Sequence, residues 1–191
     1  MHNIEMNYIM QFWEKYPDVR KFFRTHISDA HENTGELITH ADDHIVNFFE
    51  DFKHKGYLKN TNVMIIADHG PHFFIRHLPI VPDDSRQQEI SFPLLIHLAP
   101  KNISDTYKQN MKNNEQSFMN SHDIYATLKS YAVGKSAKSP AVNESFSYIY
   151  DDIPENRHCV NTDIDYEHCW CSPDKEYNRK QRAEQYLFYY D

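Results

Sequence analysis

The feature that most constrains the fold is a short apolar run that ends on an aspartate, a histidine and a glycine. Residues 62–67 read Asn-Val-Met-Ile-Ile-Ala, and Asp68, His69 and Gly70 come next. A short apolar run without polar alternation is typical of a strand buried on both faces. Polar side chains after such a strand lie at the carboxyl edge of the sheet, where α/β proteins bind ligands. The carboxylate and imidazole donors suit a divalent cation such as zinc.

The preceding segments complete a strand–helix–strand pattern. Residues 21–27 read as a first strand, and residues 33–52 carry apolar side chains at helical spacing after a start that resembles a capping box. With the strand at 62–67, this order predicts a βαβ unit whose strands are parallel. The sequence therefore indicates an α/β fold.

The predicted unit brings two polar clusters together. Asp29 and His31 follow the first strand, as Asp68 and His69 follow the second. If the strands are neighbours, four side chains of the kind that bind metals converge on one edge of the sheet. A hydrogen-bonded turn is the alternative role for Asp68 and His69, and helix capping is the alternative for Asp29 and His31.

The rest of the chain adds a third strand and a tail. Residues 92–98 read as the strand, after a loop over 71–90 that contains three prolines. From 134 to 140 the composition turns to Gly, Ser, Lys and Ala, which indicates a linker. We therefore divide the chain into residues 1–133, which hold the sheet, and residues 134–191, a linker with a cysteine-containing tail.

Charge and segment lengths exclude several partners. The 191 residues carry a net charge of −8 with His neutral, which argues against a nucleic-acid partner because phosphate backbones need a basic face. No apolar stretch is long enough to span a membrane, and Met1 does not begin a signal peptide. The sequons at Asn102 and Asn143 would be glycosylation acceptors only if the chain entered the secretory pathway.

The three cysteines, Cys159, Cys169 and Cys171, all lie in the tail. With His158 and His168 they have the composition of a zinc site, but a Cys-x-Cys pair is closer than the usual zinc spacing. In a secreted protein the same cysteines would form disulfides, and the odd count leaves one to pair elsewhere. We favour disulfides and keep zinc as the alternative.

Several short motifs occur along the chain in an ordered set. They are His31-Glu32, Ala41-Asp42, Asn60-Thr61-Asn62-Val63, Ile66-Ala67-Asp68-His69-Gly70, Phe92-Pro93-Leu94-Leu95, His122-Asp123-Ile124-Tyr125-Ala126-Thr127-Leu128, Ile153-Pro154-Glu155-Asn156-Arg157-His158-Cys159 and Cys169-Trp170-Cys171. On this set the sequence resembles the alkaline-phosphatase superfamily, and within it the sulfatase-like animal family known as domain-of-unknown-function family 229.

The resemblance implies a doubly wound, mostly parallel sheet flanked by helices, with a metal centre that handles phosphate or sulfate esters. Asp68 and His69 would ligate the first metal. His31, with Asp29 beside it, would lie at the second metal, or His31 would contact the substrate oxyanion where only one metal binds. The metal would be zinc or calcium, with manganese also possible.

Two further histidines and an absent nucleophile complete this comparison. His72 and His77 lie where some transferase relatives place a histidine near the substrate. Superfamily members carry the nucleophile in an amino-terminal half, and nothing upstream of residue 20 matches it. Residues 1–133 would then be the carboxyl-terminal part of the catalytic domain, either truncated or a degenerate copy, and inactive alone.

The resemblance implies that the chain is part of a metal-dependent hydrolase or transferase that acts on phosphate or sulfate esters. Its substrate would be a small anionic ester, or a sulfated or phosphorylated glycan or lipid. The family resemblance places it outside the cell or in the lumen of the secretory pathway. The alternative is a non-catalytic secreted binding module on the same fold.

Overall fold

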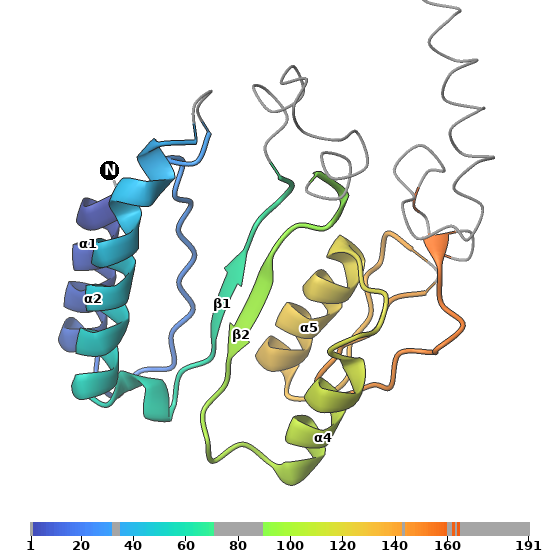
Figure 1. The fold of residues 1–191 in the computed structure, drawn as a ribbon. Helices are drawn as coiled ribbons and strands as arrows, with labels where there is room; N and C mark the ends of the chain where they lie inside the picture. The colour runs from blue at the N-terminus through green and yellow to red at the C-terminus, as the bar shows by residue number, and fades with distance from the viewer. Residues whose placement is uncertain are drawn as a thin grey trace, which may run out of the picture. The chain divides into compact units, whose positions relative to one another are not determined.

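The computed structural model describes residues 2–31, 35–70, 90–142, 144–159, 162 and 164. The chain forms two compact units, Met1–Asn102 and Ile103–Asp191. The elements of the first are α1 (His2–Lys15), η1 (Leu37–Ala41), α2 (Asp42–His54), η2 (Tyr57–Lys59), β1 (Val63–Ile66) and β2 (Leu95–Leu98). The second contains α4 (Asp105–Asn114) and α5 (Ser121–Val133) (Figure 1). The described residues therefore combine helices with a small two-stranded sheet, and only this mixed helix-and-strand content of the prediction is confirmed.

Aromatic side chains form the core between α1 and α2. Phe52 is 2% exposed, and its ring centroid lies 5.5 Å from that of Trp13 and 5.1 Å from that of Tyr57. The Trp13 indole N–H donates a hydrogen bond to Thr61 Oγ1 at 3.3 Å, so its polar edge is satisfied. Gly56 follows α2 with a φ of 78°, a left-handed conformation that glycine adopts without strain.

The two described strands pair in an antiparallel arrangement. Val63 lies opposite Leu98 and Ile66 opposite Leu95, and the Ala67 N–H donates to the Leu94 carbonyl just beyond the ladder. The parallel βαβ pair predicted between residues 21–27 and 62–67 is therefore not formed, and β1 pairs instead with β2 in the antiparallel direction. Burial on both faces is also not observed, because the side chains of β1 are only half-buried or exposed.

The strand predicted at 21–27 is another correction, because residues 20–28 hold no regular secondary structure. Phe23 packs against rings on α1, with centroid distances of 5.6 Å to Phe12 and 5.8 Å to Tyr8. Phe22 is 75% exposed. The aromatic side chain of Phe23 therefore packs on a helix and not in a sheet.

Side-chain caps begin both helices of the second unit. Ser104 Oγ accepts the Tyr107 N–H at 3.2 Å at the start of α4. At the start of α5, Asn120 and Asp123 form a reciprocal capping box. The N-cap of α5 is therefore Asn120, and Asp123 takes part in the cap from the third helical position.

The second unit also has a polar centre, in which buried side chains hold the chain after α5. The Asn114 amide donates to the carbonyls of Tyr148 at 3.0 Å and Asp151 at 2.8 Å. Its oxygen accepts the Ile153 N–H at 3.0 Å, so one 2%-exposed side chain fixes three backbone groups. The residues after 134 therefore pack with α4 in this unit, and the domain boundary placed between 133 and 134 stays a prediction.

In the part of the chain that the structure describes, no helix combines the length and apolar character that crossing a membrane requires.

Candidate functional site

Asp68 and His69 form a polar pair directly after β1. The Asp68 carboxylate accepts the His69 N–H at 3.0 Å. His69 Nδ1 lies 2.8 Å from the Gly70 carbonyl oxygen. Because a carbonyl only accepts, Nδ1 carries the proton, and in the neutral ring Nε2 then holds the lone pair. The turn thus fixes the tautomer that binds a metal through Nε2.

The distance within this pair suits a shared cation. His69 Nε2 lies 3.7 Å from Asp68 Oδ2, and the two side chains are 43% and 78% exposed. Two ligands of one tetrahedral zinc ion, each about 2.1 Å from it, lie roughly 3.4 Å apart. The pair therefore fits as two ligands of one metal ion, and it also fits as a surface ion pair when His69 is protonated.

The electrostatic surroundings keep Asp68 ionised. The His69 backbone N–H is the largest cause that lowers the pKa of Asp68, and the charge of His26 contributes a smaller part. Both contributions favour the ionised carboxylate, which is the form that binds a metal.

Asp29 has a structural partner of its own. Its Oδ1 accepts from His2 Nδ1 at 3.0 Å, and His2 Nε2 lies 2.7 Å from His44 Nδ1. Both Asp29 and His2 are largely buried, with side chains 15% and 10% exposed. The bond from His2 is the main cause that lowers the pKa of Asp29. This chain of contacts ties α1 to α2 and competes with metal ligation by Asp29.

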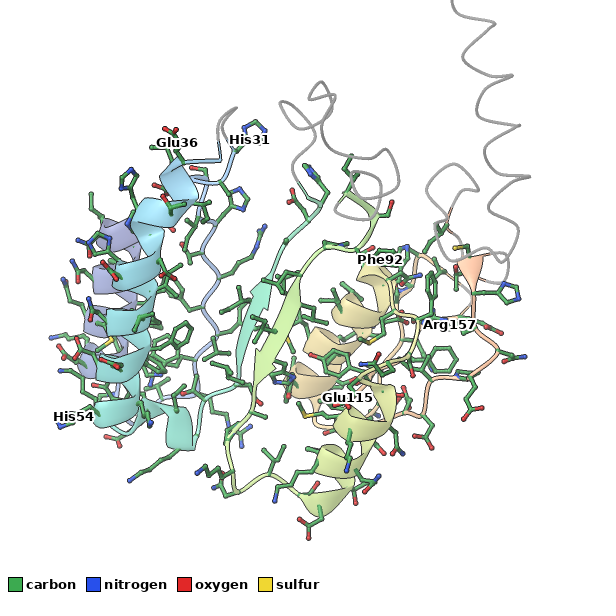
Figure 2. The ribbon with its side chains drawn as sticks, viewed as in Figure 1. His31, Glu36, His54, Phe92, Glu115 and Arg157 are labelled. Atoms are coloured by element: carbon green, nitrogen blue, oxygen red, sulfur yellow. The ribbon has the colours of Figure 1, made fainter. Side chains whose placement is uncertain are left out.

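His31 is exposed, and its backbone N–H donates a hydrogen bond to the Ser28 carbonyl at 3.0 Å. Figure 2 shows His31 and Glu36 at one end of α2, with His54 at the opposite end. Among the described residues, no three His, Cys, Asp or Glu side chains surround a common point as metal ligands would. The structure thus brings together Asp68 and His69 as a pair.

Four of the predicted site residues, His72, His77, Cys169 and Cys171, lie outside the described residues. Cys159 is described and is 3% exposed. Pairing among the cysteines stays a prediction.

Sequence reasoning missed His2, His26 and His44. His2 is the first residue of α1 and His44 lies on α2, so no local pattern marks them as neighbours. His26 was absorbed into the segment predicted as a strand. The one usable signal was the excess of histidines, thirteen in 191 residues, which gives no positions.

His97 on β2 gives a test of the sheet through pH. Burial lowers its pKa from 6.5 to about 4, and its Nε2 lies 3.2 Å from Asn62 Oδ1. The unfolded chain takes up a proton below pH 6.5 that the folded chain refuses until about pH 4, so stability falls as pH drops through that window. We expect His97→Asn to flatten this part of the pH profile in urea unfolding. Exposed His54→Gln is the control, and equal slopes for both variants would contradict the assignment.

One comparison with known proteins gives a match. A family model described as protein of unknown function (DUF229) matches residues 1–188. Neither the curated proteins nor the solved structures give a match.

Proposed function

The chain belongs to the DUF229 family of proteins of unknown function, and on that premise we propose that it is part of a metal-dependent hydrolase or transferase of phosphate or sulfate esters. The observation that carries the proposal is the Asp68–His69 pair, in which the Gly70 carbonyl holds the His69 ring in the metal-binding tautomer. Zinc or calcium, with manganese as a further candidate, would bind the ester oxygens and stabilise the charge that develops on them.

The proposal gives each residue a defined part. Asp68 and His69 hold the first metal, and His31 lies at the second metal or contacts the ester oxygens. Asp29 is the weakest member, because its Oδ1 already accepts a hydrogen bond from His2. No residue of this chain is proposed as the nucleophile. The substrate is a small anionic ester, or a sulfated or phosphorylated glycan or lipid.

The enzymatic part is tested by turnover of the full-length protein. We expect hydrolysis of an aryl phosphate or an aryl sulfate with zinc, calcium or manganese present. Asp68→Asn should reduce it by more than about 100-fold, since losing even a supporting partner of a ligand costs 10–100-fold. Asp105→Asn is the matched control, because the Asp105 side chain is fully exposed on α4. Equal rates for Asp68→Asn and the parent would overturn the proposal.

The alternative is a non-catalytic secreted binding module on the same fold. Its support is the contact between Asp29 and His2, which gives that carboxylate a structural role that needs no metal. It predicts that full-length protein keeps partner binding after Asp68 and His69 are both replaced. Loss of turnover and of metal in the same variants would favour the enzyme.

We further propose that β1 and β2 belong to a larger, doubly wound sheet of the alkaline-phosphatase type. The support is an apolar face. Leu94, Ile96 and Leu98 are 55%, 39% and 37% exposed, and the register places Val63 and Ile65 on the same face because residues opposite in an antiparallel pair share one side. Further strands and helices would cover these side chains.

This face makes a prediction about the isolated 191-residue chain. We expect it to bind the dye ANS and to self-associate, because contiguous apolar surface on a sheet with open edges promotes both. Leu94→Ser with Ile96→Thr should lower dye binding, whereas Val133→Thr, at an exposed position on α5, should leave it unchanged. A monomeric chain without dye binding, measured by light scattering and fluorescence, would contradict the larger sheet.

A further inference from the structure

The serines of the two Asn-x-Ser sequons differ in exposure, because Ser104 is exposed and Ser145 is buried. In the first, Asn102 is exposed in the turn before α4, and its side chain makes no hydrogen bond with the described residues. Ser104 is also exposed, and its oxygen accepts the Tyr107 N–H at 3.2 Å, which leaves its own hydroxyl proton available as a donor. Both groups that a glycosyl transfer needs are therefore accessible from solvent.

The second sequon ends on a serine that the fold already uses. Ser145 is 0% exposed, and its hydroxyl oxygen accepts the Ser139 N–H at 2.7 Å. Ser139 is itself 5% exposed, so this bond lies inside the second unit. Packing and hydrogen bonding account for Ser145 without any modification. Nothing in the described fold accounts in that way for Asn102.

We propose that Asn102 is an N-glycosylation site and that the sequon at Asn143 is not used in the folded protein. The co-reactant is an oligosaccharide linked to a lipid through pyrophosphate. The Asn102 amide nitrogen forms a bond to the first sugar carbon, the bond from that carbon to the phosphate oxygen breaks, and the lipid pyrophosphate leaves while the amide loses one proton. The inference rests on the further proposal, implied by the family resemblance, that the protein enters the secretory pathway.

The position of Asn102 allows the glycan without loss of structure. The amide side chain is exposed, and the capping bond at the start of α4 comes from Ser104 Oγ, which the reaction leaves untouched. Ser104→Ala would remove both the sequon and the cap that begins α4, so it would destabilise the helix as well. Asn102→Gln removes the acceptor and keeps the cap, so it is the cleaner variant.

The test expresses the full chain behind a cleavable signal peptide in animal cells, with gel mobility measured before and after peptide-N-glycosidase. We expect one glycan-sized shift that disappears in Asn102→Gln and Asn102→Asp and persists in Asn143→Gln and Ser104→Thr. An unshifted parent, or a shift that survives Asn102→Gln, would overturn the inference.

The added signal peptide separates this result from the proposed function. Because the added signal peptide ensures translocation, an unglycosylated chain would refute glycosylation of Asn102. It would leave the proposed ester chemistry untouched. Conversely, if the chain is glycosylated but the full-length protein shows no turnover, glycosylation of Asn102 stands and the enzyme proposal is refuted.

Discussion

Replacing Asp123 with asparagine is expected to cost the second unit about 3–5 kcal/mol of unfolding free energy, the range for breaking a buried ion pair by removing one partner. The Asp123 side chain is 0% exposed, and its Oδ2 lies 2.6 Å from Arg157 Nη1, whose side chain is 2% exposed. The same carboxylate accepts the N–H groups of Asn120 and Phe146, each at 2.8 Å. An amide has one oxygen and cannot accept from all three sites.

The measurement is urea unfolding followed by circular dichroism. Asp105→Asn, at an exposed position on the neighbouring helix, should stay within about 0.5 kcal/mol of the parent. Arg157→Met should destabilise as well, and the double variant should cost less than the sum, because the remaining charge is no longer buried alone. A small effect of Asp123→Asn, equal to that of the control, would show that this pair does not hold the unit together.

Phe52→Ala is the second change with a large expected effect, about 3–5 kcal/mol in the first unit. Phe52 fills the core between α1 and α2, with its ring 5.5 Å from Trp13 and 5.4 Å from Phe48. Removing it leaves a cavity that rigid aromatic neighbours cannot close. The unfolding of this unit is followed by Trp13 fluorescence in a Trp170→Phe background.

Phe22→Ala is the matched control for this variant. It removes the same side chain from a position that is 75% exposed, so the unfolding free energy should change by no more than about 0.5 kcal/mol. Equal losses for the two variants would mean that the aromatic core does not stabilise the unit as described.

Local signals in the sequence predicted the body of α2 and the positions of two strands, but the helix start predicted near residue 33 is wrong, because a 3-10 turn fills Leu37–Ala41 and α2 begins at Asp42. The apolar spacing over α2, the glycine after it and the apolar runs at β1 and β2 each act within a few residues, where periodicity is informative. The strand predicted at 21–27 is wrong because Phe23 packs on the rings of α1 and not in a sheet. The parallel βαβ unit depended on that strand, so it is wrong as well.

In the candidate site, too, residues marked by their neighbours in sequence were predictable, whereas contacts between distant residues were not. Asp68 and His69 were found because they follow an apolar strand directly. The contact of Asp29 with His2 joins residues 27 apart, and His2 with His44 joins residues 42 apart, so no spacing rule could reveal them. Asp123 belongs to a capping box that lies within four residues, but its partner Arg157 lies 34 residues away, so no local pattern indicates its role in the core.

The most direct test of the central claim is the metal content of the full-length protein, measured by elemental analysis after dialysis against metal-free buffer. The account predicts a divalent metal in a near-stoichiometric amount in the parent, and its loss when Asp68→Asn and His69→Gln are combined. Asp105→Asn should keep the metal. A parent without metal, or a double variant with as much metal as the parent, would contradict the assignment of Asp68 and His69 as ligands.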